Sequence, residues 1–155
     1  MDDLILEIRV ATAWVDYNGH MNDAEYARVF SLAVDAFWEA IGLDEAARDA
    51  TGVTTFTLEA HICYLAECLE GQALSVRVAV LDRDAKRFHL LFSLYRPDDT
   101  LAATGEQMLM AIDRTTHRAT TFPETVMQTA DRYPVRDPAD WPAQVGRVIG
   151  IRRQA

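Results

Sequence analysis

The chain has 155 residues, half of them hydrophobic and a quarter charged, which suits one domain with a sizeable core and is too short for two ordinary domains. Its formal net charge of −9 argues against a nucleic-acid partner, because such binding depends on Lys and Arg neutralising phosphates. No apolar run approaches the roughly 20 residues of a membrane span, and the start Met1-Asp2-Asp3 is unlike a signal peptide. These features predict a cytoplasmic protein without a membrane partner.

A strand and a long helix are the first elements that the pattern predicts. Residues 4–10 alternate around Glu7 and Arg9 as a strand does, and the strand continues irregularly to Trp14. A helix is predicted over about residues 22–41, because its apolar residues recur at intervals of three and four. Those residues are Tyr26, Val29, Phe30, Ala33, Phe37 and Ile41. Gly42 suits the left-handed position that ends a helix.

Four strands are predicted after a short helical connection at residues 44–50. They cover residues 53–65, 73–81, 87–95 and 101–113, with turn-forming residues between them. Gly105 inside the last strand signals a bulge or a close approach of another segment. A strand, a long helix and then an antiparallel meander is an α+β order, in which the helix lies on one face of the sheet.

The end of the chain is less regular. A short helix starting near Pro123 is predicted within residues 120–133, whereas the following segment, which contains Pro134, Pro138 and Pro142, fits no strong pattern. We therefore predict one domain over residues 1–133 and a C-terminal tail over residues 134–155.

Two cysteines, Cys63 and Cys68, are five residues apart in a segment that we interpret as a strand. Alternation would put them on opposite faces, which argues against a mutual disulfide. No second Cys/His couple with ligand spacing accompanies them, so we predict reduced core thiols and no metal site.

The junction between the first strand and the helix carries the residues most suited to chemistry. Asp16, Asn18 and Gly19 form a turn signal, and His20 follows just before the predicted helix. Unpaired N–H groups and the positive end of the helix dipole make such a place attractive to an oxyanion or a carbonyl oxygen. The Asp16 carboxylate could attack a carbonyl carbon, draw a proton from water, or merely cap the turn or the helix.

This stretch resembles the hotdog-fold acyl-CoA thioesterases of the 4-hydroxybenzoyl-CoA thioesterase type. Their first strand commonly ends in an Asp, followed after two residues by Gly-His-hydrophobic-Asn-Asn and then by a Tyr near the start of the helix. The matching residues here are Asp16, Gly19, His20, Met21, Asn22 and Tyr26, whereas Asp23 stands where the second Asn is usual. The resemblance covers residues 5–125 in element order.

The resemblance implies a hotdog fold, in which a curved antiparallel sheet wraps around one long central helix. It also implies an enzyme that hydrolyses a small acyl-CoA thioester to the free acid and coenzyme A, with Asp16 as nucleophile or general base. Such a hydrolysis needs neither a metal nor a cofactor. The overall pattern is also similar to thioesterases linked to carnitine breakdown. Two rival functions stay open: a hotdog hydratase or dehydratase of acyl thioesters, and an acyl-CoA binding module without turnover.

Backbone groups of the motif are expected to stabilise the reaction. Thioester cleavage develops negative charge on the carbonyl oxygen, and the amides of Met21, Asn22 and Asp23 are the candidate donors to it. Gly19 would let the substrate approach closely and would adopt the dihedral angles that the turn needs. A plain turn glycine is compatible with that role.

Three side chains of the motif have alternative roles. His20 could hydrogen-bond the carbonyl, orient Asp16 or exchange protons, or it could serve only as a structural partner. Asn22 could hold the loop through side-chain bonds to the backbone or contact the substrate. Tyr26 is expected in the core, with its hydroxyl at the edge of the substrate cavity.

A second cluster lies on the strand predicted after the helix and consists of Glu59, His61 and Tyr64 with Glu67. Alternation puts Glu59 and His61 on one face and Tyr64 on the other, unless a bulge intervenes. Two ionisable groups on one face of a largely apolar strand favour a contribution to substrate binding, with a solvated edge as the alternative for Glu59. A metal site made from His20, His61 and Glu59 would lack any ligand motif, so none is predicted.

Coenzyme A carries phosphates, so basic side chains should hold it. Two groups could do so or could be solvated surface: Arg83, Lys86 and Arg87 about one turn, and Arg147, Arg152 and Arg153 in the tail. Aromatic surface near the proposed pocket would favour a cationic acyl group such as a betaine. Its candidates are Trp14, Tyr17, Trp38 and Phe56.

The assembly is expected to be a homo-oligomer. A single hotdog unit leaves a long edge strand, and unpaired edges usually call for pairing. We therefore predict a homodimer or homotetramer, with the active site completed by a second subunit.

Overall fold

The computed structural model describes residues 2–151 and 153. The elements in this part of the chain are β1 (Asp3–Arg9), η1 (Thr12–Trp14), α1 (Asp23–Ala40), α2 (Glu45–Thr51), β2 (Val53–Tyr64), β3 (Ala73–Arg83), β4 (Arg87–Tyr95), β5 (Leu101–Asp113), α3 (Glu124–Ala130) and η2 (Pro138–Asp140). Across these residues, no helix combines the length and the apolar character that crossing a membrane requires.

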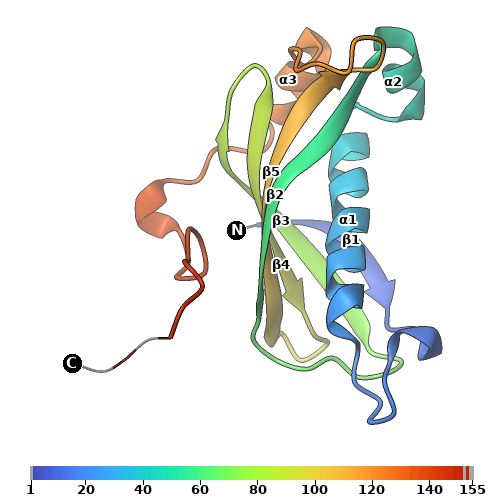
Figure 1. Ribbon diagram of the computed structural model, residues 1–155, viewed down its shortest axis with the longest axis vertical. Helices are drawn as coiled ribbons and strands as arrows, with labels where there is room; N and C mark the ends of the chain where they lie inside the picture. The colour runs from blue at the N-terminus through green and yellow to red at the C-terminus, as the bar shows by residue number, and fades with distance from the viewer. Residues whose placement is uncertain (1, 152, 154–155) are drawn as a thin grey trace.

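One curved sheet carries the whole fold. Its five strands lie in the order β1-β3-β4-β5-β2, and every neighbouring pair is antiparallel. The long helix α1 lies along one face of this sheet, and the C-terminal segment lies against the opposite face (Figure 1). This is the α+β arrangement predicted from the order of the elements, with the helix embraced by the sheet as in a hotdog fold.

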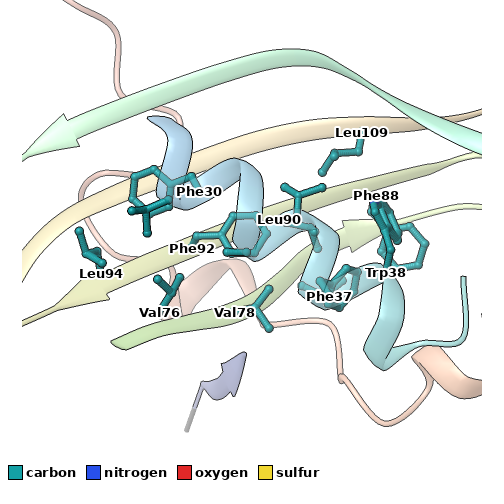
Figure 2. Close-up of a cluster of buried hydrophobic side chains, with 14 of the residues drawn as sticks. Phe30, Phe37, Trp38, Val76, Val78, Phe88, Leu90, Phe92, Leu94 and Leu109 are labelled. Atoms are coloured by element: carbon teal, nitrogen blue, oxygen red, sulfur yellow. The ribbon is translucent and has the colours of Figure 1, made fainter. Parts of the chain in front are cut away.

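The core lies between α1 and the sheet face that the helix covers (Figure 2). Its labelled members are Phe30, Phe37, Trp38, Val76, Val78, Phe88, Leu90, Phe92, Leu94 and Leu109. Alternate residues of β3 and β4 point at the helix, which is why these strands show period-two hydrophobicity. Burying each such side chain stabilises the fold by about 1.5 to 3 kcal/mol, so the position of α1 on the sheet is strongly determined.

Gly105 sets how closely α1 approaches β5. A Cβ atom added at this residue would lie 2.7 Å from the ring of Phe30. The close-approach interpretation of Gly105 is thereby confirmed, because the register shifts of β5 with its neighbours fall at other residues. The glycine lets an aromatic ring of the helix rest directly on the strand backbone.

Most element boundaries agree with the prediction within one or two residues, with two differences. Residues 12–14 form a 3₁₀ turn instead of an irregular continuation of the first strand. Strand β2 ends at Tyr64, so Cys68 lies in the following loop and the alternation argument about the two cysteines was wrong. Cys63 and Cys68 are both free and buried, and burial raises the pKa of the Cys68 thiol.

The segment after residue 133 covers the sheet face opposite α1, which we call the outer face. Trp141 and Val145 pack on an apolar cluster of β3 and β4 made of Ala79, Leu81 and Leu91. Glu106 ties the segment down, because its Oε2 accepts a hydrogen bond from the amide of Gly146 at 2.8 Å. Its Oε1 lies 2.7 Å from Nε2 of His89. The segment predicted to be a tail is therefore packed onto the sheet as far as residue 146.

Candidate active site

Two loops meet at the amino end of α1. One joins β1 to α1, the other joins β2 to β3, and both lie at the same end of the molecule (Figure 1). Backbone hydrogen bonds connect them: the amide of Met21 donates to the carbonyl of Cys68 at 2.8 Å, and the amide of Glu70 donates to the carbonyl of Gly19 at 3.2 Å. The residues of the sequence motif are therefore held by a segment about 50 positions further along the chain.

Asp16 lies half-buried in the turn before the helix. Its Oδ1 accepts hydrogen bonds from the amides of Asn18 at 2.8 Å and His20 at 3.2 Å. Gly19, with a φ of +75°, closes the turn by donating its amide to the Asp16 carbonyl at 3.0 Å. The Asp16 side chain therefore caps the turn, and it does so through Oδ1. The other oxygen, Oδ2, accepts no hydrogen bond from the residues that the structure describes, so capping and chemistry are compatible in this geometry.

The helix start corrects the set of expected oxyanion donors. The amide of Met21 is already bonded to Cys68, and the amide of Asn22 donates to the carbonyl of Trp14 at 2.9 Å. Asp23 is the remaining candidate, since its amide has no acceptor among the residues that the structure describes. The positive end of the α1 dipole supports this donor.

Asn22 and Met21 hold the turn in different ways. Asn22 occupies the N-cap position of α1, but its exposed side chain makes no cap hydrogen bond. The expectation that this side chain holds the loop was wrong, because the loop is held by the backbone of Asn22 instead. The Met21 side chain is buried in the core, which anchors the end of the turn.

Tyr26 connects the helix to the second loop. Its ring is buried, and its hydroxyl donates to the carbonyl of Ala66 at 3.3 Å and accepts from the amide of Cys68 at 3.1 Å. Burial and the hydrogen bond with Cys68 raise the pKa of Tyr26, so the hydroxyl stays protonated and can donate. The expected core position is confirmed. The hydroxyl, expected at a cavity edge, instead fixes the backbone on both sides of Glu67.

Glu67 reaches back to the motif. Its Oε2 lies 3.2 Å from Nδ1 of His20, and both side chains are partly exposed. His20 also forms an isolated antiparallel bridge with Leu69. Sequence spacing alone had no means of placing residue 67 beside residue 20, because the contact depends on the loop after β2 folding back on the helix start.

The aromatic residues near the site differ from the predicted set. Tyr17 is 97% exposed on the turn, and Tyr64 stands at the helix start, where its hydroxyl donates to the carbonyl of Asp23 at 3.3 Å. Trp38 is buried in the core about 22 Å further along α1, at about 1.5 Å of rise per residue. It is therefore removed from the candidates, whereas Tyr64, whose ring meets Tyr26 edge to face at 5.2 Å, joins them.

Glu59 and His61 lie on the outer face of the sheet. The register pairs Glu59 with Met108 and His61 with Glu106, whereas Tyr64 pairs with Ala103 on the helix side. Both line a cavity of about 350 Å³ that also includes Arg147 of the C-terminal segment. The predicted division of the strand faces holds, but within one chain these two residues are on the far side of the sheet from Asp16.

The basic residues expected near coenzyme A phosphates are mostly at the other end of the chain's long axis. The β3–β4 turn lies opposite the motif loop (Figure 1), and its arginines have acidic partners: Arg83 pairs with Asp131 and Arg87 with Asp84. Lys86 and Arg153 are exposed. Arg152 lies outside the described residues. Two arginines not singled out from the sequence, Arg9 and Arg96, line a cavity of about 520 Å³ beside the second loop.

Metal ligands do not gather in the part of the chain that the structure describes. Among those residues, no group of three or more His, Cys, Asp or Glu side chains could hold a metal ion. His20 lies on the helix side of the sheet, whereas His61 and Glu59 lie on its outer face.

Comparison with known proteins decides the family. The model of the thioesterase-like superfamily matches residues 10–129, which include the motif turn, α1 and all of the sheet after it. The chain belongs to the thioesterase-like superfamily. The match begins just before the turn that carries Asp16, so Asp16, His20 and Glu67 lie inside the matched region.

Three relatives of this thioesterase-like protein are informative. A betainyl-CoA thioesterase from Pseudomonas aeruginosa is 42% identical over 147 residues, which cover 94% of this chain and 92% of the relative. The L-carnitine dehydrogenase/betainyl-CoA thioesterase of Agrobacterium fabrum is 37% identical over 146 residues, which cover 94% of this chain and 30% of that longer protein. A solved structure from Staphylococcus aureus, determined in complex with CoA, has a TM-score of 0.89 and 36% identity over 98% of both chains.

These findings confirm the predicted fold and class of activity. The sheet and helix arrangement is that of hotdog-fold thioesterases, and the protein is a thioester hydrolase of the acyl-CoA type. The hydratase and the binding module are correspondingly weakened as rivals. The acyl group, the catalytic residues and the assembly are matters for the proposals below.

The Tyr26 hydroxyl should contribute measurably to the free energy of unfolding. Tyr26→Phe leaves the buried amide of Cys68 without its acceptor, and an unsatisfied buried donor costs about 1 to 3 kcal/mol. At about 2 to 4 °C per kcal/mol for a chain of this size, we expect thermal unfolding several degrees lower. Tyr95→Phe, which removes the hydroxyl of a half-buried Tyr on β4, is the control. Equal melting temperatures for the two variants would contradict the role of the hydroxyl.

Proposed function

We propose that the protein hydrolyses betainyl-CoA to betaine and coenzyme A, with Asp16 as the catalytic carboxylate. The observation that carries this proposal is the Asp16 side chain, fixed through Oδ1 beside the amino end of α1 with Oδ2 left to meet a ligand. The choice of acyl group is supported by the relative from Pseudomonas aeruginosa, which is similar over nearly the whole of both chains.

The reaction follows from the charges at the helix start. Asp16 either attacks the thioester carbonyl carbon or takes a proton from a water that attacks it. Negative charge then develops on the carbonyl oxygen, where the amide of Asp23 and the positive end of the α1 dipole stabilise it. Collapse of the tetrahedral species breaks the C–S bond and releases the thiolate of coenzyme A. On the nucleophilic route, a second step with water frees the acid from Asp16.

The surroundings suit a cationic acyl group. A quaternary ammonium is attracted to aromatic faces, and Tyr17 and Tyr64 present exposed rings next to the motif turn and the helix start. Carboxylates of Asp23 and Glu67 are also on this surface. An acyl group with a negative charge would meet repulsion here, so specificity for a cation is consistent with the local electrostatics.

Coenzyme A phosphates would be held by Arg9 and Arg96. Both line the cavity beside the loop that follows β2. Arg96 donates to the carbonyl of Glu67 at 3.4 Å and pairs with Asp98 at 2.8 Å, so location in the fold, and not the lack of an acidic partner, favours these two arginines. Guanidinium groups bind phosphate through several parallel donors. Arg9 ends β1 and Arg96 follows β4, and the end of β1 and the β4–β5 turn lie at the same end of the fold as the loop before α1, unlike the β3–β4 turn (Figure 1).

We place the reaction in the cytoplasm. Disulfides persist in oxidising compartments and are rare in the cytosol. The two cysteines of this chain are free and buried, which suits a reducing compartment.

A thiol-release assay tests the catalytic proposal. Wild-type protein is compared with Asp16→Asn on short, branched, aromatic and betainyl-CoA substrates, and betainyl-CoA should give the largest kcat/KM. Asn can still cap the turn but neither attacks nor takes a proton, so kcat should fall by about 10² to 10⁴. Asp44→Asn is the matched control, because Asp44 caps α2 in the same way through the amide of Ala47 and should leave activity unchanged.

Three outcomes of that assay would contradict the proposal. Equal losses of kcat in the Asp16 and Asp44 variants would mean that Asp16 acts only as a capping residue. A change of absorbance at a substrate double bond without free thiol would indicate a hydratase. Binding of acyl-CoA without product would indicate a binding module.

A dimer should form through β2. This strand of 12 residues is at one edge of the sheet, and Phe56 and Leu58 on it are each 48% exposed. Unpaired edges with exposed apolar side chains favour pairing with another strand. A twofold axis would place β2 of each subunit beside β2 of the other, which continues the sheet and brings a second copy toward Tyr64 at the helix start.

Molar mass in solution tests the dimer. Light scattering after size exclusion should give about twice the 17.4 kDa of one chain, or four times that mass if dimers pair further. Leu58→Lys puts a charge on the edge and should shift the mass toward one chain. Leu4→Lys, at a residue of β1 that is 49% exposed on the other edge strand, should leave the mass unchanged. Dissociation by the Leu4 substitution alone would place the interface at β1 instead.

A further inference from the structure

We infer that Glu67 is a positioning residue, which holds the imidazole of His20 with its hydrogen on Nδ1 so that Nε2 exchanges the proton of the attacking water. The inference rests on the proposed function and deepens it. It starts from the 3.2 Å separation of Glu67 Oε2 and His20 Nδ1. An ionised carboxylate can only accept hydrogen bonds, so it favours the ring form that carries a hydrogen on the adjacent nitrogen.

The Glu67 backbone is fixed from three directions. The carbonyl of Ala66 and the amide of Cys68, on either side of it, are both bonded to the buried hydroxyl of Tyr26. The carbonyl of Glu67 itself accepts from Nη1 of Arg96 at 3.4 Å. A loop residue held this firmly can orient a partner, whereas a freely moving carboxylate would not.

His20 is also tied to the catalytic carboxylate. Its amide donates to Oδ1 of Asp16 at 3.2 Å, so the imidazole and the carboxylate belong to one turn. With a hydrogen on Nδ1, the neutral ring has its lone pair on Nε2. A base whose second nitrogen is oriented by a carboxylate is a general arrangement for taking a proton in hydrolysis.

The imidazole acts in the second step of the nucleophilic route. In the first step Oδ2 of Asp16 bonds to the acyl carbon, the C–S bond breaks and its electron pair stays on sulfur, so coenzyme A leaves as the thiolate. Water then bonds to the acyl carbon of the acyl-Asp16 anhydride while one O–H bond breaks and that proton moves to Nε2, and the acyl–Oδ2 bond breaks with its electron pair on Asp16. The proton on Nε2 passes to the thiolate or to solvent, which regenerates the neutral ring.

The contact is too exposed to matter much for folding. The side chains of His20 and Glu67 are 41% and 57% exposed, and ion pairs of this kind contribute little to stability. Loss of Glu67 should therefore appear in turnover and leave the melting temperature nearly unchanged. That separation distinguishes positioning from a structural role.

A double-mutant cycle with betainyl-CoA tests the inference. His20→Ala should lower kcat by about 10² to 10⁴, the usual contribution of a general base, and Glu67→Ala by a smaller factor with KM nearly constant. In the His20→Ala background, Glu67→Ala should cause no further loss. Glu67→Gln, whose amide oxygen still accepts from Nδ1, should recover part of kcat. Glu70→Ala in the same loop, where Glu70 bonds Thr12 instead, should match wild type.

Nitrogen NMR of the His20 ring gives a readout that needs no turnover. The hydrogen should be found on Nδ1 in the wild-type protein, and its preference for that nitrogen should be lost in Glu67→Ala. Additive losses in the cycle, or a ring form that does not respond to Glu67, would overturn the inference. A wild-type protein that frees no thiol from any acyl-CoA would instead overturn the proposed function, which keeps the two failures distinct.

Discussion

The pairing of two loops at the amino end of α1 is the constraint on which the rest of the site depends. The helix is anchored on the sheet by its apolar face, and the ring of Phe30 rests on the backbone at Gly105. From this fixed helix the Tyr26 hydroxyl reaches Ala66 and Cys68. Cys68 in turn accepts from Met21. These hydrogen bonds connect the buried helix to the motif turn. The turn is therefore held in place although it lies far from the centre of the sheet.

Asp16 illustrates how one carboxylate can serve both structure and chemistry. Hydrogen bonds to Oδ1 from Asn18 and His20 hold the side chain in one orientation, and such restraint is what a reacting group needs for effective attack. A side chain free to rotate would cap less and react less. Capping of the turn therefore does not compete with the proposed catalytic role at this position.

Local periodicity was enough to predict most of the fold. Apolar residues recur every three or four positions from Tyr26 to Ile41 and every second position in residues 87–95. Both patterns arise because one side of each element is buried in the core, so the sequence alone reveals them. Gly105 was recognisable as a special position, because a glycine within an apolar strand signals a bulge or a close approach, and the ring of Phe30 shows that it is a close approach. The motif turn was recognisable through its residue types.

Features that depend on contacts between distant segments were beyond the sequence. The amides of Met21 and Asn22 looked free, but Cys68 and Trp14 accept their hydrogen bonds. Alternation divided Glu59 and His61 from Tyr64 correctly, yet it carries no sign that tells which face meets α1. Trp38 is on the apolar side of the helix like the residues near the site, but at the other end of its length. Glu67 could be grouped with the second cluster from the sequence, but its contact with His20 depends on the loop after β2 folding back on the helix start.

A crystal structure of Asp16→Asn with betainyl-CoA would show whether the thioester binds at the amino end of α1, next to the paired loops. We expect the thioester carbonyl carbon about 3 to 3.5 Å from the side chain at position 16, with the carbonyl oxygen accepting from the amide of Asp23. A thioester bound on the outer face, in the cavity lined by Glu59 and His61, would contradict it.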